Sequence, residues 1–102
     1  MIVPVKGVAA MGIDLSDIGV GEVALLVPEP ENSHDAHAIR VEVRGRLVGY
    51  LDRHLAARIN AADYRATVGA VLPHPETGKP AGLRLDLRLL RVDLRLRRDW
   101  AL

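Results

Sequence analysis

The last part of the sequence alternates apolar and polar residues more strictly than any other part. From Leu83 to Leu96, leucine or valine occupies nearly every second position, with arginine or aspartate between. Successive side chains of a strand point to opposite faces, so this pattern predicts a strand with one buried and one solvated face. The alternation slips once, at Leu89-Leu90, where a β-bulge would return both halves to the same face.

The length of this run restricts the fold. At about 3.3 Å per residue, residues 82–98 would span roughly 56 Å as a straight strand. A compact domain of about 100 residues is only about 34 Å across. The strand must therefore bend around a small barrel or project from the domain. A projecting strand would expose an edge for pairing with a second copy of the chain, which predicts a homodimer through residues 83–96.

Further strands and a helix are expected along the rest of the chain. Asp52 is a suitable N-cap for a helix over about 53–61, in which Leu55, Ala56 and Ile59 share one face. Many short strands with one or two short helices predict a mainly β fold, a small barrel of about six strands. The stretch from Met11 to Ile18 is left unassigned. Apolar runs bounded by glycine and proline predict the other strands, at residues 2–8, 22–27, 38–43, 46–51 and 64–72.

Length and composition exclude several classes of protein. The chain has 102 residues, of which 49% are hydrophobic, so residues 1–102 are expected to form a single domain. Cysteine is absent, which excludes disulfides, thiolate metal clusters and cysteine nucleophiles. The apolar start at Met1 to Val5 is too short for a secretory signal, and no stretch reaches the roughly 20 apolar residues of a membrane span. We expect a soluble, cytoplasmic protein that does not contact membranes.

The net charge of +1 is too small for bulk attraction to nucleic acid. Its distribution is uneven, because residues 1–80 carry −2 and residues 81–102 carry +3. Arginine outnumbers lysine twelve to two. This excess fits bidentate contacts with phosphate, and it fits a GC-rich genome equally well.

The sequence offers little for catalysis or metal binding. Serine and threonine occur only at positions 16, 33, 67 and 77, and none has a base at a suitable spacing. His34, Asp35 and His37, with His54 further on, form the one cluster that could ligate a metal ion. No metal-binding frame surrounds them, so they are interpreted as loop residues. We expect no enzyme, no cofactor and no metal.

Residues 28–55 combine a polar loop with two strands and the start of the helix. Pro28 and Pro30 lack backbone donors, while Asn32 and Asp35 can accept hydrogen bonds from nearby amides. These residues predict a loop pinned in one conformation. The strands that follow are joined by the short connection Arg44-Gly45-Arg46.

This segment resembles the HIRAN domain in residue type and in spacing over about thirty positions. The resemblance implies a module of about a hundred residues with an OB-fold-like barrel, found alone in bacteria and phages or fused to SNF2-type helicases. A helicase-linked member binds single-stranded DNA at a free 3′-hydroxyl end. The matching positions are Glu29-Pro30, Asn32, Asp35, Ala38-Ile39, Val41, Val48-Gly49-Tyr50-Leu51 and Leu55-Ala56.

The resemblance implies a set of nucleic-acid-binding residues. Asp35 would lie at the pocket for the terminal nucleotide, accept a hydrogen bond from a sugar hydroxyl and repel a 3′-phosphate. Tyr50 and Arg53 would lie beside the binding groove, although a half-buried barrel residue and a solvated helix residue are equally good interpretations of these two. The full set is Met11, Gly12, Asn32, His34, Asp35, Tyr50 and Arg53.

One loop departs from the family pattern. DNA-binding members carry a basic residue and paired aromatics after the first strand, where this chain reads Val8-Ala9-Ala10-Met11-Gly12-Ile13. Two hypotheses follow. The first is a non-catalytic module for single-stranded DNA 3′ ends, working with a separately encoded helicase or nuclease. The second is a protein-interaction or assembly module that keeps the fold without binding DNA.

Overall fold

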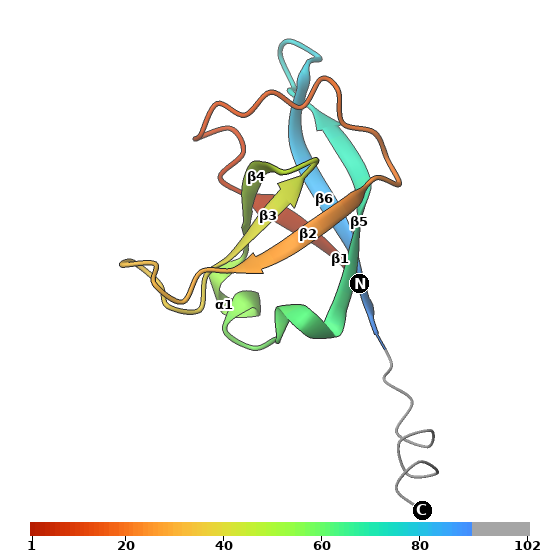
Figure 1. Cartoon of the computed structure of the whole chain (residues 1–102). Helices are drawn as coiled ribbons and strands as arrows, with labels where there is room; N and C mark the ends of the chain where they lie inside the picture. The colour runs from red at the N-terminus through yellow and green to blue at the C-terminus, as the bar shows by residue number, and fades with distance from the viewer. Residues whose placement is uncertain (91–102) are drawn as a thin grey trace, which may run out of the picture.

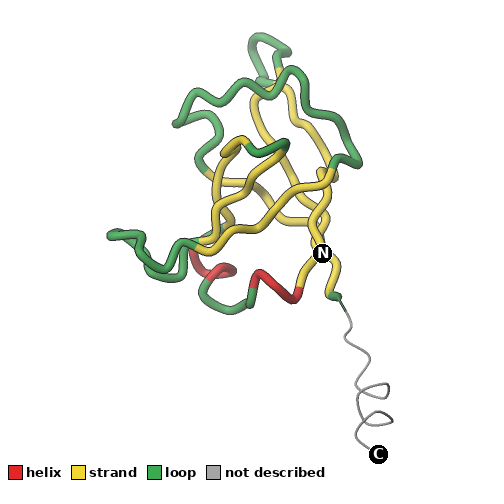
Figure 2. The backbone as a smooth tube through the Cα atoms, viewed as in Figure 1, coloured by secondary structure: helices red, strands yellow, loops and turns green. Residues whose placement is uncertain are grey.

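The computed structural model describes residues 1–90 as a closed antiparallel barrel with strand order β1-β4-β3-β2-β5-β6 (Figures 1 and 2). Strand β6 pairs with β1 and thereby closes the barrel. The mainly β, six-stranded fold predicted from the sequence is confirmed. The strands are β1 (Ile2–Lys6), β2 (Val23–Pro28), β3 (Ile39–Val43), β4 (Arg46–Leu51), β5 (Tyr64–Pro73) and β6 (Pro80–Leu89).

The core is the inside of the barrel, filled by alternate residues of the strands. On β6, Leu83, Leu85 and Leu87 are 2% exposed or less, while Arg84 and Arg88 between and beyond them are exposed. Each strand thus buries one face, as the alternation predicts. No helix within residues 1–90 is long and apolar enough to cross a membrane.

The pairing of β5 with β6 is irregular at two places. The pairing of β5 with β6 shifts register between Val68 and Ala70, and the residue between them is Gly69. A Cβ atom on Gly69 would lie 3.4 Å from the backbone nitrogen of Asp86, so the two strands approach closely there. This irregularity therefore lies on β5, and a second shift, between Leu72 and Pro73, leaves Ala81 of β6 without a partner in the register. The bulge predicted at Leu89-Leu90 falls where β6 ends, and residues 91–98 lie outside the described residues.

The middle of β6, residues 84–87, does not project from the barrel. Residues 84–86 pair with β1 on one side and with β5 on the other, and Leu87 exchanges two hydrogen bonds with Met1. Over these residues the exposed edge expected for a homodimer does not exist, because closing the barrel uses both edges. Residues 91–96 of the proposed dimer strand lie outside the described residues.

The helix is much shorter than the predicted 53–61. Helix α1 spans Arg53–Ala56, with Asp52 as its N-cap as expected, and a 3₁₀ turn, η1, follows at Ala61–Asp63. The side chain of Asn60 accepts a hydrogen bond from the N–H of Ala62 and so caps this second turn separately from α1. Two short turns suffice to place Ala56 and Ala61 in the core.

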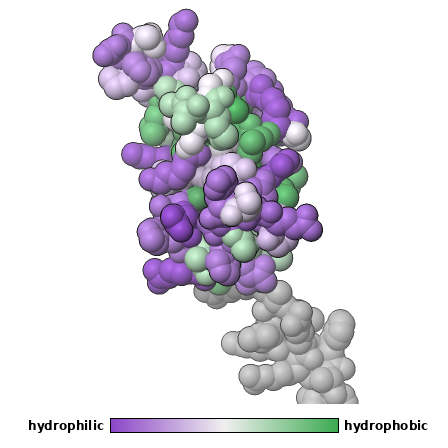
Figure 3. All heavy atoms as spheres, turned by 90° about the vertical axis from the view of Figure 1, so that its left-hand side faces the viewer, coloured by the Kyte–Doolittle hydropathy of each residue, from purple (hydrophilic) through white to green (hydrophobic). Residues whose placement is uncertain are grey.

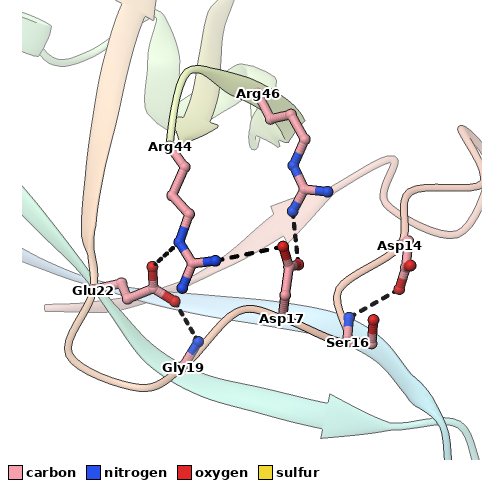
Figure 4. Close-up of polar contacts among 7 residues, drawn as sticks. All are labelled: Asp14, Ser16, Asp17, Gly19, Glu22, Arg44 and Arg46. Atoms are coloured by element: carbon pink, nitrogen blue, oxygen red, sulfur yellow. Dashed lines mark hydrogen bonds and ion pairs between the residues drawn. The ribbon is translucent and has the colours of Figure 1, made fainter.

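The long loop 7–22, left unassigned from the sequence, crosses one end of the barrel (Figure 1). Leu15 and Ile18 anchor it, with 1% and 6% of their surface exposed. Ion pairs attach it to the β3–β4 turn, since Arg44 Nε lies 2.6 Å from Glu22 Oε1 and Arg46 Nη2 lies 2.8 Å from Asp17 Oδ1 (Figure 4). Hydrogen bonding to Arg46 lowers the pKa of Asp17, which keeps its carboxylate charged.

Candidate functional site

The loop 29–38 at the opposite end of the barrel is held by its own polar side chains. Asn32 Oδ1 accepts hydrogen bonds from the backbone N–H of His34 at 2.9 Å and of Asp35 at 3.2 Å. Asp35 Oδ1 accepts one from the N–H of His37 at 2.9 Å. The backbone N–H of Ala38 donates to the carbonyl of Asp35. The prediction that Asn32 and Asp35 pin this loop is confirmed.

Glu29 joins this loop to the barrel, a role the sequence did not indicate. Its Oε1 accepts a hydrogen bond from Asn32 Nδ2 at 2.9 Å, and its Oε2 accepts one from the Tyr50 hydroxyl at 3.2 Å. Arg40 Nη1 lies 3.7 Å from the same Oε2. The only local signal was a carboxylate three residues before Asn32; the contact with Tyr50 spans 21 positions and carries no local signal.

Tyr50 is half-buried on the outer side of β4, where it pairs with Lys6 of β1 and Arg40 of β3. Burial, and then the hydrogen bond to Glu29, raise the pKa of its phenol. The hydroxyl therefore stays protonated near neutral pH and donates to Glu29, which fixes the plane of the ring. Arg40 is occupied by its ion pairs with Glu42 and Glu29, and the bond to Glu42 raises the pKa of its guanidinium.

A shallow pocket of about 340 Å³ opens between the loop, the end of β4 and the first turn of α1. Asp35 presents its second carboxylate oxygen, Oδ2, which has no hydrogen-bond partner within residues 1–90. Arg53 is exposed and forms no ion pair with the described part of the chain, so its charge is available. The pocket thus combines a free acceptor, a cation and one aromatic ring. Its lining is Asn32, His34, Asp35, Ala38, Tyr50, Leu51 and Arg53.

The structure therefore brings together five of the seven residues expected at the site. The other two, Met11 and Gly12, belong to loop 7–22 and do not line this pocket. That loop leaves β1 directly after Lys6, the partner of Tyr50, and then turns away through Gly7, whose φ is 83°. Met11 is 39% exposed in the turn that follows.

Gly49 brings the start of loop 7–22 close to the pocket strand. A Cβ atom at Gly49 would meet the Val5 side chain and lie 2.6 Å from the carbonyl oxygen of Lys6. Only glycine allows β1 and β4 to approach this closely beside Tyr50.

The histidines and acids of this region do not form a metal centre. Within residues 1–90, no group of three or more histidine, aspartate or glutamate side chains is arranged to hold a metal ion. The carboxylate of Asp35 is used instead to bind the backbone N–H of His37.

The face of the barrel on which the pocket opens is mainly polar. Figure 3, in which the left-hand side of Figure 1 faces the viewer, shows hydrophilic side chains over most of this face. Hydrophobic side chains gather toward its upper end. This surface suits a charged, hydrated ligand better than an apolar one.

Two comparisons with known proteins identify relatives. The sequence profile of the HIRAN domain family matches residues 3–71, more than half of the chain. The crystal structure of the HIRAN domain of human HLTF matches the fold with a TM-score of 0.60 and 20% sequence identity. The match covers 85% of this chain and 73% of that one. No curated protein sequence matches the chain.

Proposed function

We propose that this chain, which belongs to the HIRAN domain family, binds single-stranded DNA without catalysis and recognises a free 3′-hydroxyl end in the pocket beside Tyr50. The observation that carries this proposal is the convergence of five expected residues from three separate elements on one pocket. The DNA ligand itself comes from the family resemblance.

The chemistry of the pocket suits the terminal nucleotide. Asp35 Oδ2 is an unused acceptor for the 3′-hydroxyl, and its negative charge would repel a 3′-phosphate. Arg53 supplies a guanidinium for the preceding phosphate. Tyr50, held by Glu29, offers a fixed ring edge and face to the last sugar or base.

We expect the affinity to be low. Base stacking on an aromatic ring contributes about 1–3 kcal/mol per base, and loop 7–22 contains no aromatic residue. Tyr50 is the single aromatic residue that lines the pocket. The module would then work beside a separately encoded helicase or nuclease that supplies most of the binding.

Fluorescence anisotropy with short single strands tests the proposal. A strand ending in a 3′-hydroxyl should bind more tightly than the same strand ending in a 3′-phosphate, by about tenfold if the phosphate adds one charge repulsion and removes one hydrogen bond. Equal affinity for the two strands, or no binding of either at low salt, would contradict it. RNA strands with the same ends show whether the sugar type matters.

Two variants assign the preference to the pocket. Asp35→Asn keeps an oxygen for the N–H of His37 and removes the charge, so it should bring the two affinities together. Asp63→Asn removes a charge from η1, away from the pocket, and should leave the preference unchanged. Should both variants behave alike, the preference does not arise at Asp35.

A further inference from the structure

Two arginines stand directly opposite each other on the outer face of β5 and β6. Arg65 and Arg88 are cross-strand partners, and both are exposed. Like charges at directly opposed positions of an antiparallel pair are destabilising. Arg65 forms no ion pair within residues 1–90, and Arg88 contacts only Asp86, at 3.5 Å. Within residues 1–90, therefore, no side chain fully neutralises this repulsive pair.

These arginines form one wall of a groove of about 300 Å³. Asp86 compensates little of their charge, because it also lies 3.5 Å from the N-terminal ammonium group of Met1. The hydroxyl of Thr67, which also lines the groove, makes no hydrogen bond within residues 1–90 and is therefore an unused donor. The complete lining is Gly21, Val23, Arg65, Thr67 and Arg88.

The groove shares no residue with the pocket at Tyr50. Its residues come from β2, β5 and β6 and from the end of loop 7–22, while the pocket belongs to loop 29–38, β4 and α1. In the barrel, β3 and β2 separate β4 from β5. Of the five groove residues, only Arg88 lies beyond residues 3–71, which the family profile matches.

We propose that this groove is a second nucleic-acid contact, in which Arg65, Arg88 and Thr67 bind backbone phosphates. These contacts do not require a strand end, so any phosphate of the DNA strand can occupy the groove. The two neighbouring guanidinium groups offer parallel N–H donors that match phosphate oxygens, and Thr67 adds a hydroxyl donor. A phosphate between the arginines would also remove their repulsion. The inference rests on the proposed function in taking DNA as the source of phosphate.

Closed circular single-stranded DNA is the decisive probe, because it has phosphates and no 3′ end. The wild-type chain should bind the circle at low salt. Arg65→Ser/Arg88→Ser should weaken this binding about tenfold or more. It should also lower the slope of log affinity against log salt by about 1.4, because each phosphate that an arginine neutralises adds about 0.7 to that slope. A strand of about six nucleotides with a 3′-hydroxyl should keep its preference over the 3′-phosphate in this variant.

Arg58→Ser/Lys79→Ser is the matched control, since it removes the same charge from exposed positions outside the groove. It should leave the affinity for the circle within about twofold of wild type. The proposal that the groove binds phosphates would be contradicted if the wild-type chain failed to bind the circle. Equal losses of affinity in the two double variants would contradict it as well. Displacement of the circle by poly-glutamate as readily as by polyphosphate would overturn the preference for phosphate.

The outcomes separate the two proposals. If the circle binds through the arginines but short strands show no preference between 3′ ends, the groove stands and the end pocket fails. If short strands show the preference and the circle does not bind, the end pocket stands and the groove fails. A thermal melt of Arg65→Ser/Arg88→Ser guards against misfolding, because removing a like-charge pair should leave the Tm equal to or above that of wild type.

Discussion

The two long loops of the barrel, 29–38 and 7–22, are ordered by different means. Loop 29–38 is held by hydrogen bonds between near neighbours, such as those from His34 and Asp35 to Asn32. Loop 7–22 also has short-range hydrogen bonds, such as that from the N–H of Gly19 to Glu22, but residues far from it in sequence hold it as well, through ion pairs with Arg44 and Arg46 and through burial of two side chains. The difference teaches that loop 29–38, which lines the pocket, is ordered mainly by its own side chains, whereas loop 7–22, which carries Met11 and Gly12 of the expected site, depends also on ion pairs with the barrel.

The largest effect is expected at Gly49, where the supports of the two loops meet. Gly49→Ala would place a Cβ atom against Val5 and the carbonyl oxygen of Lys6, at a φ of 154°. We expect the free energy of unfolding to fall by about 2–4 kcal/mol, measured by urea denaturation. Gly12→Ala is the control, because Gly12 has a φ of 64° with nothing near its Cβ position, and should cost about 1 kcal/mol. Similar losses of stability in the two variants would mean that the close approach of the strands at Gly49 is unimportant.

A smaller effect is expected when the local support of loop 29–38 is removed. Asn32→Ala deletes the acceptor for two backbone N–H groups and the donor to Glu29, which should lower the free energy of unfolding by about 1–2 kcal/mol. Asn60→Ala deletes the acceptor for one N–H and should cost about half as much. Amide hydrogen exchange should quicken at His34 and Asp35 in the first variant and leave loop 7–22 unchanged. Faster exchange in both loops would show that they are coupled.

The link between loop 29–38 and Tyr50 can be broken without a change of shape. Glu29→Gln removes the negative charge beside the phenol, so the pKa of Tyr50 should fall toward its ordinary value near 10 but stay above it, because burial remains. An ultraviolet titration in a Tyr64→Phe background isolates Tyr50, since the chain has two tyrosines. The raised pKa also means that this contact stabilises the fold below pH 10 and ceases to do so as pH rises through the folded-state pKa. An unchanged titration curve would remove Glu29 as a cause.

The smallest effect concerns the ion pairs of loop 7–22, which are exposed and screened by salt. The pKa of Asp17 is lowered by Arg46, and that of Glu22 is lowered by the N–H of Gly19 and by Arg44. Their stabilisation is present above the ordinary carboxylate pKa and is lost as pH falls through the lowered values. Added salt, or pH below about 4, should therefore quicken amide exchange around Gly19 while His34 and Asp35 change less. Equal responses in the two loops would contradict the contrast between them.

The same contrast explains what could be predicted from the sequence. The strands and the pinning by Asn32 and Asp35 depend on periodicity and on contacts within a few residues, so the sequence carried them. The pairing of Arg46 with Asp17 spans 29 positions, so no local sequence pattern predicts it. The slip in alternation at Leu89-Leu90 predicts a bulge that the described residues do not test, and the irregularities that the structure shows lie at Gly69 of β5 and Ala81 of β6.

The site was predictable to the extent that it follows from the resemblance. Five of the residues that the resemblance implies line one pocket: Asn32, His34, Asp35, Tyr50 and Arg53. Glu29 was missed because its importance comes from Tyr50, which reaches it only in the folded barrel. The apolar spacing of Leu55, Ala56 and Ile59 predicts a helix to residue 61, but α1 ends at Ala56 and a separate turn capped by Asn60 follows.

The turn between β3 and β4 places one residue under two opposing demands. Arg44 has a φ of 54° and Gly45 a φ of 74°, a two-residue turn for which asparagine is the better first residue. Yet Arg44 supplies the ion pairs that hold loop 7–22. Arg44→Asn would then make a protein that melts at a higher temperature while one of its loops moves more freely. A higher Tm and a better ordered loop 7–22 would then be separate properties, and selection for the first alone would favour a protein in which this loop is more mobile.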